Sequence, residues 1–181
     1  MNRRRLAPLA LLRQIEQDAM AAAPALPQEI EAAVLWSGVG FKIGDRYLAS
    51  QLDHVREVLP TPVVTPAPGV KSWVRGVANV RGDLITIVDL AGFLGHPPVF
   101  LGDRVRLLVM NAPELRAGLL VSEVLGLRHF DEEVERREVG SLEDSAIRPY
   151  LGGAFVRDDV LWGIFDMKAL AASPTFKHVA A

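Results

Sequence analysis

The stretch GVANVRGDLITIVDL, residues 76–90, decides the fold of this chain. An apolar segment leads into Val80-Arg81-Gly82-Asp83, and a second apolar segment follows at once. Glycine and aspartate tolerate left-handed backbone geometry, so these residues predict a tight turn between two strands. Asp89 stands where a helix N-cap would, before the short helix-like segment 90–94. The stretch therefore predicts a β-hairpin followed by a capped helix.

The same pattern returns near the end of the chain. Residues 152–161, GGAFVRDDVL, align with residues 76–85. With one inserted residue the match continues, and Ile164–Met167 aligns with Ile87–Leu90. Asp166 then takes the N-cap position before a helix over 167–172. A repeat of this kind indicates two halves with one architecture.

Each of these hairpins is preceded by another. Two strands joined by a turn are expected over residues 39–49 and again over residues 105–121. One more apolar segment follows each hairpin, at 54–59 in the first half and at 123–130 in the second. Each half thus offers about five short, closely spaced strands with turn signals between them. That pattern predicts an all-β fold, a small barrel or sandwich, in which closure of the sheet removes its exposed edges.

The domain boundaries follow from this repeat. We expect a first half over about 34–95 and a second over about 103–172, with a C-terminal tail at 173–181. Halves of this size bury too little surface to be stable alone, so they should dock on each other. The run Leu84–Val88 has almost no polar alternation, which is typical of a strand buried on both faces, and is the expected seam.

The N-terminal residues 1–33 are predicted to form a helical extension and linker. Arg3–Arg5 precede the apolar run Leu6–Leu12, which could be read as a signal peptide. The run is short and contains Pro8, so an amphipathic helix is the better interpretation. No stretch approaches the length of a membrane-spanning helix, so we expect a soluble, cytoplasmic protein without direct membrane insertion.

Composition excludes several classes of protein. Of the 181 residues, 50% are hydrophobic and 23% charged, which indicates a globular chain rather than a disordered one. The net charge of −2 argues against a nucleic-acid partner, because there is no basic excess to neutralise phosphates. The absence of cysteine excludes disulfides, a thiolate nucleophile and cysteine-ligated metals.

A search for catalytic residues leaves few candidates. No serine-hydrolase elbow and no phosphate-binding loop occurs, and the tryptophans read as packing residues. The histidines lack metal-ligand spacing and are expected on the surface or partly buried: His54, His96, His129 and His178. Asp89 and Asp166 read as helix caps. The alternative is an enzyme that uses Asp89 or Asp131 between the two halves. We predict no metal site and no cofactor.

The region around residues 76–90 resembles the signature of the CheW family of chemotaxis adaptors. Val80 replaces the usual leucine and Thr86 the usual proline. The matching positions are Gly76, Asn79, Arg81, Gly82, Asp89 and Leu90. Further pieces are 41–47, 55–59 and 117–125, so the resemblance covers about residues 34–172. Within the family, the chain is similar to the adaptors of twitching-motility (type IV pilus) systems.

The resemblance implies two intertwined SH3-like five-stranded β-barrels with short helices. It also implies an adaptor without enzymatic activity or cofactor. Its partners would be the signalling tip of a methyl-accepting chemoreceptor and the regulatory domain of a CheA-type histidine kinase. The protein would then join membrane-bound receptor arrays through these partners. An adaptor of flagellar chemotaxis is the alternative within the family.

The resemblance also suggests a groove for the helical receptor tip. Val55, Glu57, Asn79 and Arg81 would lie on the first barrel, and Leu127 would line the opposite side. We expect an exposed ion pair between Glu57 and Arg81, whose value lies in orientation more than in stability. An ordinary surface salt bridge is the alternative interpretation. Val55 and Leu127 could instead belong to the core. Gly82 is expected to be structural, because the turn needs a positive φ there.

Overall fold

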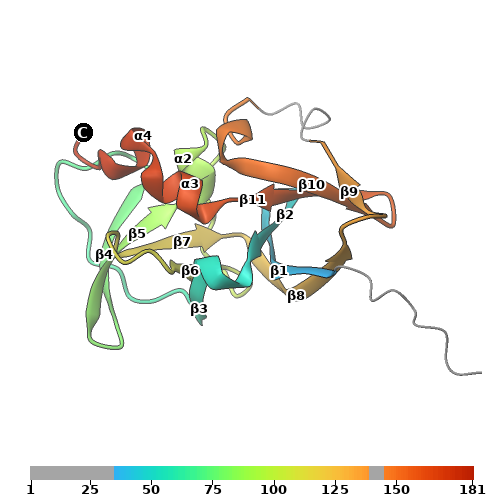
Figure 1. Ribbon diagram of the computed structural model, residues 1–181. Helices are drawn as coiled ribbons and strands as arrows, with labels where there is room; N and C mark the ends of the chain where they lie inside the picture. The colour runs from blue at the N-terminus through green and yellow to red at the C-terminus, as the bar shows by residue number, and fades with distance from the viewer. Residues whose placement is uncertain (1–34, 139–144) are drawn as a thin grey trace, which may run out of the picture. The chain divides into compact units, whose positions relative to one another are not determined.

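Two β-sheets built from short strands make up most of the structure, which is a computed structural model that describes residues 35–138 and 145–181 (Figure 1). The predicted N-terminal extension, residues 1–33, lies outside the described residues. Within the described ranges no helix has the length and the hydropathy that a membrane span requires.

The strands form one six-stranded and one five-stranded sheet. The six-stranded sheet runs in the order β8 (Glu123–Asp131), β1 (Leu35–Ile43), β2 (Arg46–Gln51), β11 (Val160–Phe165), β10 (Leu151–Arg157) and β9 (Arg136–Arg137). The five-stranded sheet runs in the order β3 (Val55–Pro60), β6 (Arg106–Met110), β7 (Ala117–Val121), β5 (Asp83–Asp89) and β4 (Val74–Val80). The helices are short: η1 (Leu52–His54), α2 (Leu90–Phe93), η3 (Arg148–Tyr150), α3 (Met167–Ala172) and α4 (Pro174–Lys177).

The mostly β prediction is confirmed, whereas the barrel description is not. Each sheet remains open, since in the described part of the chain no backbone ladder joins β3 to β4 or β8 to β9. Both sheets nevertheless follow one rule. The first hairpin of each predicted half sits in the sheet of the other half: β1–β2 lies between β8 and β11, and β6–β7 lies between β3 and β5.

The exchange of hairpins makes β5 one of the strands at the seam between the halves, as predicted. β5 pairs in parallel with β7, and β2 pairs in parallel with β11, so each parallel contact joins the two halves. The expectation that residues 84–88 are buried on both faces is wrong at Leu84, which is 60% exposed. Leu84 lies one residue beyond the hairpin turn, where only Asn79 faces it across the ladder.

The second hairpin and the capped helix of the repeat, β4–β5–α2 and β10–β11–α3, have a constant offset of 77 residues. A bulge interrupts β4 at Arg75 and β10 at Gly152, and the next residues, Gly76 and Gly153, have φ of +134° and +149°. The predicted alignment of Gly76 with Gly152 is therefore wrong by one residue in β10. The dipeptide Val-Arg occurs in both turns one register apart, and this similarity favoured the wrong alignment.

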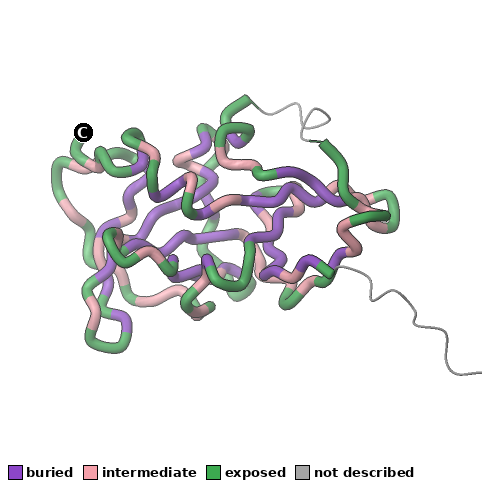
Figure 2. Tube along the Cα trace, viewed as in Figure 1, coloured by how far each residue is buried: buried purple, intermediate pink, exposed green. Residues whose placement is uncertain are grey.

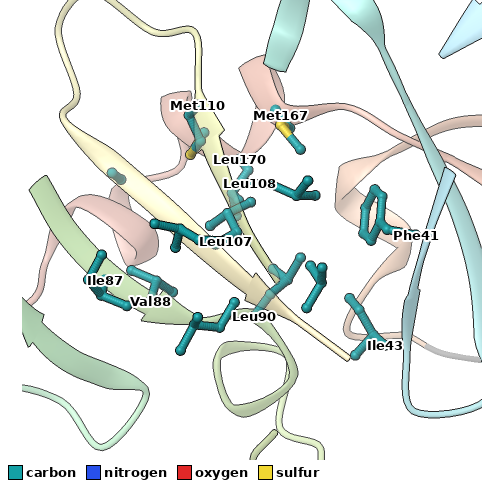
Figure 3. Packing of buried hydrophobic residues seen from close by; sticks show 14 of the residues in the cluster. Phe41, Ile43, Ile87, Val88, Leu90, Leu107, Leu108, Met110, Met167 and Leu170 are labelled. Carbon is teal, nitrogen blue, oxygen red and sulfur yellow. The ribbon is translucent and has the colours of Figure 1, made fainter. Parts of the chain in front are cut away.

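Buried residues follow the strands of both sheets (Figure 2), and most of the apolar ones belong to a single cluster. Side chains of β1, β5 and β6 gather in one interior, to which α3 adds Met167 and Leu170 (Figure 3). Full burial of one such side chain stabilises a fold by roughly 1.5–3 kcal/mol. A second, smaller cluster belongs to the six-stranded sheet and is mainly aromatic. In it Phe130 stacks on Phe155 with ring centroids 4.6 Å apart.

The tryptophans are packing residues, as predicted. Trp36 and Trp162 belong to the aromatic cluster, and all three are at most 9% exposed. Trp73 packs against α4, where Phe176 stacks on it with ring centroids 6.1 Å apart. Residues 173–181, assigned to a tail from sequence, thus pack on the first half, and Ala180 forms a β-bridge with Val70.

Candidate interaction surface

The β4–β5 hairpin projects two residues with left-handed backbone at its tip. Arg81 has φ of +51° and Gly82 of +93°, so the predicted positive φ at Gly82 is confirmed. A side chain in this conformation costs about 1–2 kcal/mol, which glycine avoids. Asn79 Oδ1 accepts the Gly82 N–H at 2.9 Å. Asn79, predicted as a groove residue, therefore has a local role in holding the turn.

The predicted contact between Glu57 and Arg81 is present. Arg81 Nε lies 3.0 Å from Glu57 Oε2, and the arginine side chain is 76% exposed. A second ion pair, Arg56 to Asp83 at 3.1 Å, lies on the same side. Both pairs therefore connect the β4–β5 hairpin to β3, and within the described ranges no ladder joins β3 to either strand of the hairpin. Exposed pairs of this kind contribute at most about 1 kcal/mol, so their effect is to fix the hairpin's position.

The other two predicted groove residues differ in burial and in place. Val55 is partly buried and packs against the main core, which favours the core interpretation. Leu127 is 52% exposed and lies on β8 of the six-stranded sheet, opposite Val39. The structure brings Glu57 and Arg81 together, whereas Leu127 lies in the other sheet.

A cavity lies beside the β4–β5 hairpin, and the predicted groove residues do not line it. The cavity to which Asp83 contributes, of about 190 Å³, is bordered by Arg56 and Arg116 and by none of the five predicted residues in the described part of the chain. A partner at this hairpin would therefore meet a surface of charged side chains rather than a deep pocket.

The two carboxylates considered for catalysis, Asp89 and Asp131, accept hydrogen bonds from backbone N–H groups. Asp89 is 1% exposed, and its Oδ1 accepts the Gly92 N–H at 3.0 Å, so the cap prediction is confirmed. Asp131 Oδ1 accepts the N–H groups of Glu133 and Val134 in a turn. Two carboxylates that are committed to backbone donors give the enzyme alternative no acid–base pair. Among residues 35–138 and 145–181, no cluster of acidic and histidine side chains could hold a metal ion.

His54 is the residue whose environment differs most from the sequence prediction. The expectation of a surface or partly buried histidine is wrong, because the side chain is 5% exposed. Burial lowers the pKa of His54, which keeps the imidazole neutral near pH 7. Its Nδ1 has no hydrogen-bond partner and lies 3.7 Å from Asp166 Oδ1.

Asp53, next to this histidine, faces outward. Its carboxylate pairs with Lys168 Nζ at 2.9 Å, and this hydrogen bond holds the pKa of Asp53 below its ordinary value. Since Asp53 is on η1 and Lys168 on α3, the pair connects the two halves of the repeat at the surface. His54 and Asp166 line a cavity beneath it.

Comparison with known proteins gives one consistent result. Residues 37–175 match the CheW-like domain family. Protein PilI of Pseudomonas aeruginosa is 42% identical over 173 residues, which are 96% of each chain. Protein FrzA of Myxococcus xanthus is 36% identical over 90 residues, 50% of this chain and 56% of FrzA. The crystal structure of the scaffolding protein CheW from Thermoanaerobacter tengcongensis shares the fold, with a TM-score of 0.63 and 21% identity over 72% of this chain and 88% of that one.

Proposed function

Because the chain belongs to the CheW family, whose members are non-enzymatic scaffold adaptors, we propose that it couples a methyl-accepting chemoreceptor to a CheA-type histidine kinase. The pathway we propose is the chemosensory control of type IV pilus twitching motility. Its support is the similarity to PilI, which extends over nearly the whole of both chains. In this proposal the protein joins receptor arrays through its partners.

The observation that carries the receptor half of the proposal is the anchored, exposed Arg81. The left-handed turn and the ion pair to Glu57 fix where this guanidinium stands, while most of its surface is open to a partner. A helical hairpin needs apolar contacts for affinity and a few charges for register. The β4–β5 hairpin supplies fixed charges, and exposed Leu84 beside them supplies apolar surface.

The test is a pull-down of the full chain with a receptor signalling tip and, separately, with the kinase regulatory domain. We expect Arg81→Ala to weaken receptor capture about tenfold, as the loss of a charged contact of roughly 1.5 kcal/mol would do. Its melting temperature should stay close to that of the parent, and kinase capture should be unchanged. Arg104→Ala, which removes another exposed arginine, is the matched control.

Two outcomes would contradict the proposal. If the parent chain captures neither partner, the adaptor function is wrong. If Arg81→Ala unfolds the protein, the residue is structural and the receptor site lies elsewhere. Complementation separates the pathways: restored twitching in a strain without its own adaptor supports the pilus assignment, and restored swimming supports the flagellar alternative.

A further inference from the structure

The repeat places two equivalent corners in the molecule, one in each sheet. Each corner consists of a β-bulge residue and the aspartate that caps the following helix. In the first corner these are Arg75 and Asp89, and in the second they are Gly152 and Asp166. The backbone geometry agrees, because the Asp89 N–H donates to Trp73 O and the Asp166 N–H to Tyr150 O, both at 2.8 Å.

The first corner is filled by its own arginine. Arg75 Nη2 donates to Asp89 Oδ2 at 2.7 Å and to Val99 O at 3.0 Å. Asp89 Oδ2 also accepts the Val99 N–H. The guanidinium covers the carboxylate, which is why Asp89 is only 1% exposed. A planar group with several N–H donors suits a carboxylate that already caps a helix with its other oxygen.

The second corner lacks this side chain. Gly152 replaces the arginine, and a Cβ built on it would meet nothing within 4 Å. A cavity of about 190 Å³ occupies the place, and Asp166 is 40% exposed. Asp166 Oδ1 caps α3 by accepting the N–H groups of Lys168 and Ala169. Among the described residues its Oδ2 has no hydrogen-bond partner.

A buried polar atom without a hydrogen-bond partner among the described residues lines the same cavity. It is Nδ1 of His54, whose side chain is 5% exposed. An unsatisfied buried nitrogen costs free energy unless a partner reaches it. The remaining charged residues on the cavity wall, Glu132 and Arg136, lie 3.4 Å from each other. With their charges balanced, the carboxylate of Asp166 gives the cavity a net negative charge.

We propose that this cavity binds a guanidinium group from a ligand or a partner, in the position that Arg75 occupies in the first corner. The guanidinium would donate to Asp166 Oδ2, while Trp36 and Phe165 contact its apolar stem. With the imidazole proton of His54 on Nε2, Nδ1 would serve as a second acceptor. A lysine ammonium lacks the planar fork, and a neutral urea group lacks the charge. This inference comes from the repeat and does not depend on the proposed function.

The test is a titration of the full chain with N-acetyl-L-arginine amide, followed by NMR. The corresponding lysine and citrulline amides serve as comparison probes. We expect the arginine probe to shift the amide signals of residues around Gly152 and Asp166, with at least about tenfold weaker binding of both comparison probes. No saturable shift by the arginine probe, or equal binding of the citrulline probe, would overturn the proposal.

Variants locate the site without removing the helix cap. Asp166→Asn keeps a capping oxygen but removes the charge, and should weaken binding about tenfold. Gly152→Arg supplies the missing side chain from within and should abolish binding, whereas Gly152→Ala should leave it intact. Asp45→Asn, which removes an exposed carboxylate elsewhere, is the charge control. If Gly152→Arg folds and binds the probe as well as the parent does, the cavity is not the site.

A second experiment shows whether the guanidinium belongs to a protein partner or to a free compound. The receptor tip and the kinase regulatory domain are each captured by the parent and by Gly152→Arg. Loss of capture with the variant identifies an arginine of that partner, while unchanged capture together with probe binding identifies a free guanidinium compound.

Discussion

The two sheets share one backbone plan and differ in how their side chains complete it. Five strands of each follow the same order, and β9 is added at one edge of the six-stranded sheet. Both sheets have a bulge before the helix-capping aspartate and a two-residue left-handed turn. In the five-stranded sheet Arg75 closes the corner, and the turn is held to β3 by an ion pair. In the six-stranded sheet the corner is open and the interior is aromatic. The repeat therefore preserves geometry, while surfaces and cavities have diverged between the copies.

The two capping aspartates should show the largest difference in stability between the copies. Asp89→Ala removes a cap and leaves Arg75 without its buried partner, so we expect the free energy of unfolding to fall by about 3 kcal/mol. Asp166→Ala removes only a cap and should cost about 1 kcal/mol. Urea denaturation measures both values. Equal losses would mean that the Arg75 pair contributes nothing, which would break the comparison.

Substitutions in the two left-handed turns should differ less in their effect on stability. Gly82→Val places a β-branched side chain at φ of +93° and should cost about 2 kcal/mol through backbone strain alone, because no atom lies within 4 Å of a new Cβ. Asp159, the equivalent residue, already accepts φ of +60°. Asp159→Gly should therefore change stability by less than about 0.5 kcal/mol.

Thermal unfolding of both variants, with Gly82→Asn as the control that tolerates left-handed geometry, tests this prediction. If Gly82→Val is as stable as its parent, the turn does not require glycine, and its structural assignment is wrong.

The smallest expected effect is a pH dependence of stability that arises from an ion pair of the six-stranded sheet. Arg157 donates to Glu135 Oε2 at 2.6 Å, and this hydrogen bond holds the pKa of Glu135 below its ordinary value of 4.5. The folded state thus prefers the charged carboxylate. Its stabilisation is complete well above pH 4.5 and is lost as the pH falls through that value and below.

Glu135→Gln should remove this contribution, at most about 1 kcal/mol because the pair is partly exposed. Melting temperatures of parent and variant between pH 7 and pH 3 measure it. The two curves should converge toward acid, and a constant separation at every pH would contradict the assignment.

Local features of the fold could be predicted from sequence, and non-local pairing could not. The turn at Gly82 and the cap at Asp89 depend on residues within four positions, and both were correct. The exchange of hairpins between the sheets depends on contacts across the whole chain, which periodicity does not encode. Intertwining entered only through the family resemblance.

The candidate site shows the same division. The Glu57–Arg81 contact followed from the family motif and is present, whereas Leu127 lies on the other sheet. The alignment of Gly152 with Gly76 hides the corner at Asp166, because it matches the glycine to a residue one position too late. At the correct offset of 77, Gly152 aligns with Arg75, and the absence of the arginine is visible in the sequence itself.

The exchanged hairpins have a consequence for the order in which the chain folds. Ala49 of β2 pairs with Ile164 of β11, so a hairpin early in the described residues pairs with the last described strand. Closing such a long loop precedes any gain from the contact, which makes folding slow. Until translation reaches β11, β2 presents a bare edge to other nascent chains. The sheet is thus completed only once β11 is available, and we expect chains cut short before Val160 to aggregate.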